Sequence, residues 1–190
     1  MNALELPKLE LPMVSRRGFA LSTATVALLA GVRIAGAAEA PAEDAKILNV
    51  ALGLEHEAIN AYQLGAQSGL LEKGVLDVAV LFQGHHKAHR DALTATIKKL
   101  GGTPVAEKKL DEYAKALKAD TLKSQGDVLT LAARLELGAA NAYLGVIPAF
   151  KDPQLAKVAG RLAADETSHW SILNNALGGK PPSSALSFGA

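Results

Sequence analysis

Two segments of this chain repeat each other, and this repeat limits the possible folds more than any other feature. The segment from Leu54 to Tyr62 is similar to the segment from Leu135 to Tyr143. A second pair, His86 to His89 and Glu166 to His169, follows in the same order. The two members of this pair lie 80 positions apart in the sequence, and those of the first pair lie 81 positions apart. A single insertion or deletion in a loop accounts for the change in offset. The repeat predicts two helical hairpins related by duplication.

Each half of the repeat has the periodicity of two amphipathic helices, because apolar residues recur every three or four positions. Ala and Leu dominate a composition with 49% hydrophobic and 4% aromatic residues, which favours helices over strands. We expect an all-α fold, a four-helix bundle over residues 43–177 followed by an irregular tail over residues 178–190. The predicted helices cover residues 44–67, 73–100, 127–147 and 153–176.

The connection between the second and third predicted helices is long, Lys-rich and mostly polar. It begins at Gly101-Gly102-Thr103-Pro104, which ends the second helix, and it contains one predicted short helix over residues 108–118. A connection of about 25 residues can cross the bundle instead of forming a tight turn between antiparallel neighbours. Its simplest interpretation is a solvated link.

Residues 1–38 have the pattern of a signal peptide and not of a folded segment. Ser15-Arg16-Arg17-Gly18-Phe19 precedes an apolar stretch, which ends in small residues suited to cleavage near Ala37 or Ala38. The paired arginines resemble a twin-arginine signal. An uncleaved anchor is the alternative, but the apolar run is shorter than the roughly 20 residues that span a bilayer. We expect a periplasmic protein exported in folded form by the twin-arginine machinery.

Charge and cysteine content exclude several classes of function. The formal net charge is +1, and the four basic and two acidic side chains of residues 1–37 account for the positive balance. The rest of the chain has no basic surplus that would attract nucleic acid. There is no cysteine, so disulfides, thiolate metal ligands and haem attachment through cysteine are excluded.

Six ionisable side chains occupy the middle of apolar helix faces, where charged groups are rare: Glu55, His86, His89, Glu136, Glu166 and His169. A buried, unpaired carboxylate costs several kcal/mol. A proton, a cationic partner or a metal ion can neutralise it, and no Lys or Arg lies at the central positions of these faces. Three carboxylates and three imidazoles suit iron, manganese or zinc.

The spacing of these residues favours a shared metal site. Residues at i and i+3 lie on one face of a helix, so Glu166 and His169 can reach one centre, as can His86 and His89. Glu55 and Glu136 would approach from the other two helices. This is the arrangement of carboxylate bundles with two metals, in which two helices give a Glu each and two give a Glu-x-x-His.

These residues make the chain similar to the ferritin-like domain family, in particular to its exported branch with a twin-arginine signal. The resemblance covers residues 43–176 and depends on Glu55, His89, Glu136 and the segment from Glu166 to His169. It implies that Glu55 and Glu136 are terminal ligands, that Glu166 bridges two metals and that each His binds one. Family members oxidise ferrous iron, store it, consume peroxide or activate oxygen, and some have lost the metal.

His86 stands where the family would have a bridging Glu. It could bind one metal terminally, or the site could hold a single metal around Glu136, Glu166 and His169. Imidazole also favours zinc or copper, and a degenerate site is a further alternative. His56 and His85 are either auxiliary ligands or residues at the surface or edge.

Two tyrosines, Tyr62 and Tyr143, match across the repeat two turns after each Glu. They either pack in the core with a buried hydroxyl hydrogen bond, donate a hydrogen bond to a ligand, or serve as redox-active phenols.

The function expected from these features is an exported redox protein with two divalent metal ions, iron first and manganese or zinc as alternatives. Oxygen or peroxide would be its small-molecule partner, and both ferroxidase-like and peroxidase-like activity stay open. The alternatives are a non-catalytic scaffold or stress protein with a degenerate site, and a metal carrier without turnover. A homo-oligomer is left open.

Overall fold

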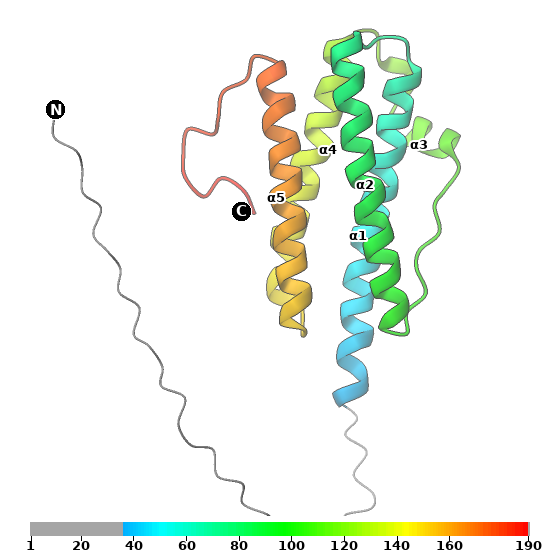
Figure 1. Cartoon of the computed structure of the whole chain (residues 1–190), viewed down its shortest axis with the longest axis vertical. Coiled ribbons are helices and arrows are strands. Elements are labelled where there is room, and N and C mark those ends of the chain that lie inside the picture. Colours follow the sequence, from blue (N-terminus) through cyan, green and yellow to red (C-terminus); the bar gives the residue numbers. More distant parts are fainter. Residues whose placement is uncertain (1–35, 190) are drawn as a thin grey trace, which may run out of the picture. The chain divides into compact units, whose positions relative to one another are not determined.

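The computed structural model describes residues 36–189, and all its regular secondary structure is helical, with no strand in that range. Its elements, drawn in Figure 1, are α1 (Gly36–Gln67), α2 (Lys73–Lys99), α3 (Leu110–Ala116), η1 (Ala119–Thr121), α4 (Gln125–Val146), η2 (Ile147–Ala149) and α5 (Pro153–Ala176). The all-α prediction is confirmed.

The predicted ends of α2, α3, α4 and α5 lie within two residues of the observed ones. The start of α1 near Asp44 was wrong, because the helix begins at Gly36. The residues before Asp44 are rich in alanine, which has the highest helix propensity, and they extend the helix past Pro41. The predicted signal peptide lies outside the described residues, except for residues 36–38 at the start of α1.

Local sequence fixes several of the helix ends. The side chain of Ser124 caps α4 by accepting from the backbone N–H of Asp127 at 3.2 Å. Asp152 caps α5 by accepting from Gln154 at 2.8 Å, and Pro153 occupies the first helical position. Gly101 follows α2 with a φ of +79°, a left-handed conformation that glycine adopts without strain.

The four long helices form two antiparallel hairpins, α1 with α2 and α4 with α5 (Figure 1). At one end of the bundle, the backbone N–H of Glu72 donates to the side chain of Gln125, so α2 and α4 begin side by side. At the other end, the buried carboxylate of Asp44 accepts from the backbone N–H groups of Lys151 and Asp152 at 2.9 and 3.1 Å. The chain therefore runs up, down, down and up, which requires the long crossover.

The crossover between α2 and α4 is anchored along α1 and is not only a solvated link. Asn49 accepts from the backbone N–H of Val105 at 2.7 Å and donates to the carbonyl of Thr103 at 3.0 Å. Farther along, Asn60 donates to Glu107 at 2.6 Å. The buried side chain of Tyr113 on α3 then packs against α1. These contacts bring the chain back to the end of the bundle where α4 begins.

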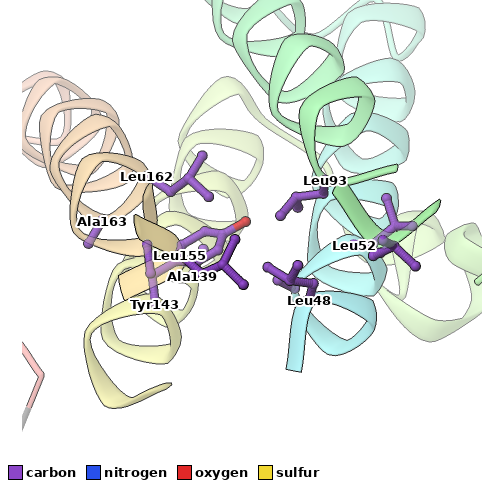
Figure 2. Close-up of a cluster of buried hydrophobic side chains, with 11 residues drawn as sticks. Leu48, Leu52, Leu93, Ala139, Tyr143, Leu155, Leu162 and Ala163 are labelled. Carbon is purple, nitrogen blue, oxygen red and sulfur yellow. The ribbon is translucent and has the colours of Figure 1, made fainter. Parts of the chain in front are cut away.

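The two larger clusters of buried apolar side chains lie on either side of the bundle's middle. The cluster in Figure 2 includes Leu48, Leu52 and Leu93 on one hairpin and Leu155 and Leu162 on the other. The second cluster includes Tyr62, Phe82, Leu129 and Leu173 and lies toward the end of the bundle where α2 and α4 begin. The six ionisable residues predicted to share a site lie between these two apolar layers.

The described part of the C-terminal tail after α5 is irregular and folds back onto the second hairpin. Its Phe188 ring packs edge-on against Trp170, with the ring centres 5.2 Å apart. The backbone N–H of Gly189 donates to Asn141 on α4 at 2.8 Å. Among the described helices, none combines the length and the apolar character needed to span a membrane.

Candidate metal centre

All four long helices contribute to a buried cluster of carboxylates and imidazoles at the middle of the bundle. Glu55 comes from α1, Glu136 from α4, and each of the other two helices gives a pair three residues apart, as the repeat predicts. Five of the six predicted residues are at most 2% exposed, and the side chain of His89 is 11% exposed. The structure thus brings all six together.

The cluster divides into two overlapping groups of four residues whose nitrogen and oxygen atoms could hold a metal ion. One group is Glu55, His86, His89 and Glu166, and the other is His86, Glu136, Glu166 and His169. The potential ligand atoms of each group lie within 4.8 Å of one another. His86 and Glu166 belong to both groups, which places them between two half-sites.

His86 presents a different ring nitrogen to each half-site. Its Nδ1 lies 2.8 Å from Glu55 Oε2, and its Nε2 lies 3.1 Å from Glu136 Oε1. Glu166 lies opposite, with Oε1 3.2 Å from His89 Nδ1 and Oε2 3.0 Å from His169 Nδ1. His86, which stands where the resemblance predicts a Glu, therefore occupies the shared position.

The contacts within the cluster shift its pKa values in opposite directions. Burial alone would lower the pKa of His86 and His89, but close contacts with the neighbouring carboxylates raise both to about 10. The pKa of His169 is also raised against the effect of burial, by Glu136 and Glu166. Burial would raise the pKa of Glu55 and Glu136, and their contacts with the histidines lower it instead. Without a metal, protonated imidazoles thus balance the carboxylates.

Three buried polar atoms of this cluster nevertheless have no hydrogen-bond partner: His89 Nδ1, Glu136 Oε2 and Glu166 Oε1. His89 Nδ1 and Glu166 Oε1 lie 3.2 Å apart without forming a hydrogen bond. Buried polar groups are rarely left unsatisfied, because each lost partner costs about 1–3 kcal/mol. All three atoms belong to the groups that could hold a metal ion. The chemistry of the donor set and these unpartnered atoms both fit a bound cation.

Two tyrosines connect the hairpins across the cluster. The hydroxyl of Tyr62 on α1 donates to Glu136 on α4, and the hydroxyl of Tyr143 on α4 donates to Glu55 on α1. Burial and the adjacent carboxylates raise the pKa of both phenols, so they stay protonated donors. Of the sequence interpretations, the structure shows the hydrogen bond to a candidate ligand, and the redox-active phenol stays a prediction.

The outward-facing nitrogens of two histidines have partners that differ in chemistry. Nε2 of His89 lies 3.2 Å from Asp165 Oδ2, whereas Nε2 of His169 lies 2.9 Å from Nδ1 of His85. Sequence analysis did not identify Asp165, although the repeat that pairs His86 with Glu166 also pairs His85 with Asp165. Such outer partners fix the tautomer and the orientation of a ligating imidazole.

His56 takes no part in the cluster. Its ring is buried against the crossover, where Nε2 lies 3.2 Å from the carbonyl oxygen of Val105 and Nδ1 lies 3.9 Å from Glu107. Successive residues of a helix are rotated by about 100°, so a residue next to Glu55 points away from the centre. His85 touches the cluster only through His169.

Comparison with known proteins supports the fold and the family. No curated protein matches the chain. A crystal structure of rv2844, a conserved hypothetical protein from Mycobacterium tuberculosis, is similar with a TM-score of 0.60 and 23% sequence identity. The match covers 76% of this chain and 97% of that one, and at this identity it shows a shared fold. Residues 43–179 match the ferritin-like domain, and the chain therefore belongs to the family of ferritin-like domain proteins.

Proposed function

We propose that this chain is an exported ferritin-like protein whose buried cluster binds two divalent metal ions for redox chemistry. Iron is the first candidate, with manganese or zinc as alternatives, and oxidation of ferrous iron or removal of peroxide is the proposed activity. The observation that carries the proposal is the pair of overlapping four-residue groups with unpartnered atoms on His89, Glu136 and Glu166.

Each half-site would have two carboxylates and two imidazoles, a donor set that suits these metals. Glu55 and His89 would serve one ion, and Glu136 and His169 the other, with Glu166 and His86 between them. A bound iron or manganese pair would supply the electrons for oxygen or peroxide, whereas zinc, which does not change its oxidation state, could be held by the same residues without redox chemistry.

The protein's own residues would orient the ligands and keep water out. Tyr62 and Tyr143 fix the carboxylates of Glu136 and Glu55 through their hydroxyl donors. Asp165 and His85 would accept from the outer N–H groups of His89 and His169, which would leave Nδ1 of each ring free to bind metal. The apolar layers above and below exclude bulk solvent, which strengthens electrostatic interactions at the site.

Export would follow from Arg16, Arg17 and the apolar stretch after them, with cleavage near Ala37 or Ala38. The twin-arginine route would carry the domain after folding, so metal could be loaded in the cytoplasm. The mass of the mature protein, measured by mass spectrometry, would locate the cleavage site.

A non-catalytic scaffold or stress protein is the second candidate, and one observation favours it. The raised pKa values of His86, His89 and His169 allow three protonated imidazoles to balance three carboxylates without a metal. A site that no longer binds metal could persist because its imidazoles and carboxylates neutralise each other.

Elemental analysis of the mature protein, before and after loading with ferrous iron, separates these candidates. We expect about two metal ions per chain. The double variant Glu136→Gln with Glu166→Gln should lose them, and Glu57→Gln, a half-buried neighbour outside the cluster, should keep them. Less than about half an ion per chain in the wild type, well below the stoichiometry of such bundles, would support the scaffold instead. Loss of added ferrous iron and of peroxide would then be followed in the loaded protein.

A further inference from the structure

A cleft lies between α2 and α5 on one side of the cluster, and nothing in the established family membership assigns it a ligand. Its volume is about 280 Å³. The two helices that border it belong to different hairpins and pack less closely on each other than on their hairpin partners. On α2, the side chains that face the cleft include the small Ala88 and Ala92. Small residues at these positions leave the space open.

The floor of the cleft is apolar. Leu48, Leu93, Leu155 and Leu162 line it, and each of them is buried in the adjacent core cluster. In Figure 2, Leu93 and Leu48 face Leu155 and Leu162 across the space between the hairpins. Such a surface is suited to an aliphatic chain, because burial of a methylene group contributes about 0.8 kcal/mol.

The rim of the cleft carries one basic side chain, Arg161, and one carboxylate, Asp165. Arg161 on α5 lines the cleft and is exposed. Asp165, one turn farther along α5, also lines the cleft, but its carboxylate lies beside His89, and no ion pair joins it to Arg161 within the described part of the chain. A guanidinium group presents several N–H donors in a fork that matches the geometry of a carboxylate.

The dimensions set the length of a suitable ligand. Arg161 and Leu155 are six residues apart on α5, which corresponds to about 9 Å along the helix. An extended chain of eight carbons spans about this distance. The cleft also reaches His89, the most exposed member of the buried cluster, whose side chain is 11% exposed.

We propose that the cleft between α2 and α5 binds a small aliphatic carboxylic acid, with its carboxylate at Arg161 and its chain along the leucines. The carboxylate end of such an acid would lie one helical turn from Asp165, the partner of His89, so the acid would adjoin the buried cluster at that end, as a substrate or a regulator. The inference rests on Arg161 and the leucine floor and does not require a bound metal, so it can hold or fail independently of the proposed function.

Calorimetric titration of the whole purified protein with octanoate, butanoate and octanol tests the proposal. Each titration is run on the metal-loaded and on the metal-stripped protein. Octanoate should bind in both forms, and its affinity should exceed that of butanoate by about fourfold for each added methylene group. Octanol, which lacks the charge, should bind about fivefold more weakly than octanoate, as expected for the loss of one exposed ion pair.

Two variants locate the site, and each has a matched control. Arg161→Gln should reduce the affinity for octanoate to that for octanol and leave octanol binding unchanged. Arg134→Gln removes an exposed arginine on α4 outside the cleft and should change neither the affinity for octanoate nor that for octanol. Ala92→Phe fills the cleft from an exposed position and should abolish binding of both ligands. Ala95→Phe adds the same ring on α2 outside the cleft lining and should have no effect.

The proposal is overturned if octanol binds as tightly as octanoate, if Arg161→Gln behaves like Arg134→Gln, or if no octanoate binds at millimolar concentration. It is also overturned if octanoate still binds Ala92→Phe. That result would place the acid elsewhere, for example in the smaller cavity of about 110 Å³ around Val75, Leu129 and Leu173, which has no charged residue in its lining.

Discussion

Nδ1 of His85 lies 2.9 Å from Nε2 of His169, at the position where the other half of the repeat pairs Asp165 with His89. The two candidate metal-binding histidines therefore differ in their outer partners, an imidazole for one and a carboxylate for the other. A carboxylate that accepts from the outer N–H of a ligating imidazole makes the opposite nitrogen a stronger ligand. The asymmetry of the site thus extends beyond His86 to the residues around it.

Placing a carboxylate at position 85, as the other half of the repeat has at position 165, should strengthen metal binding. We expect His85→Asp to raise the affinity of the weaker site at least tenfold and His85→Ala to lower it by a similar factor, as is usual for outer partners of metal ligands. Competition with a chromophoric chelator measures both. Leu81→Asp adds the same charge one turn away at an exposed position and serves as the control. Equal affinities for His85→Asp and Leu81→Asp would contradict the role of His85.

The tyrosine hydroxyls should contribute to both stability and metal binding. Tyr62→Phe and Tyr143→Phe each remove the hydroxyl donor of a buried carboxylate, which should cost about 1–3 kcal/mol of unfolding free energy in the metal-free protein. Urea denaturation measures this loss. Tyr113→Phe is the control, because its buried ring lies on α3 and its hydroxyl accepts only from the backbone of Lys108. That variant should leave metal affinity unchanged, whereas the other two should lower it.

The metal-free protein should be most stable between about pH 4.5 and 6.5. The pKa of His86 rises on folding from its ordinary value of 6.5 to about 10, so the native state holds protons that the unfolded state has released. This stability is fully present below pH 6.5 and is lost as the pH rises toward 10. The pKa of Glu55 falls on folding from 4.5, so stability is also lost as the pH falls below that value. Thermal unfolding across pH 3–10 should give this maximum, and a flat profile would contradict it.

Metal binding should compete with these protons. A metal must displace the proton from each imidazole that binds it. Because the pKa of His86 and His89 is about 10, both carry a proton at pH 7, and the apparent affinity should rise with pH between 6.5 and 10. Calorimetry in buffers of different ionisation enthalpy counts the protons released. We expect at least one proton per metal ion, and release of none would show that the histidines are not the ligands.

The substitution His86→Glu should distinguish a site that binds metal from a degenerate site. The substitution adds a carboxylate at the position shared by both half-sites and removes a protonated imidazole. The metal-free variant should lose stability, because four buried carboxylates would face two imidazoles. Iron should bind it more tightly than the wild type and raise its melting temperature by more. If iron protects neither of them, the site is degenerate, and equal protection of the variant and the wild type would contradict the expected gain in affinity.

Much of the fold and of the site could be predicted because both depend on periodicity. The helical period places Glu166 and His169 on one face, and the repeat relates them to His86 and His89, so the four-helix bundle and all six clustered residues followed from spacing. The signal peptide remains a prediction. The early start of α1 was missed because the prediction followed the periodic apolar residues, which begin after Asp44. The alanine-rich residues before Asp44 form a helix through their propensity and have no such periodicity.

The contacts between hairpins could not be predicted from local patterns. Tyr62 reaches Glu136 and Tyr143 reaches Glu55 only because the crossover places α4 beside α1, and the offset within each repeat does not specify that pairing. The anchoring of the crossover by Asn49 and Asn60 likewise joins segments that lie far apart in the sequence. Such pairings are set by how two packed surfaces meet.

The sequence by itself determined which side chains face the core of the bundle, because helix periodicity converts residue spacing directly into a face. Only the tertiary structure decided that His86 lies between two half-sites with one nitrogen toward each, and that α2 and α5 leave a cleft beside Arg161. The physical reason is that a helix fixes directions along and around its own axis, whereas the separation and rotation of neighbouring helices depend on side-chain packing across the whole bundle.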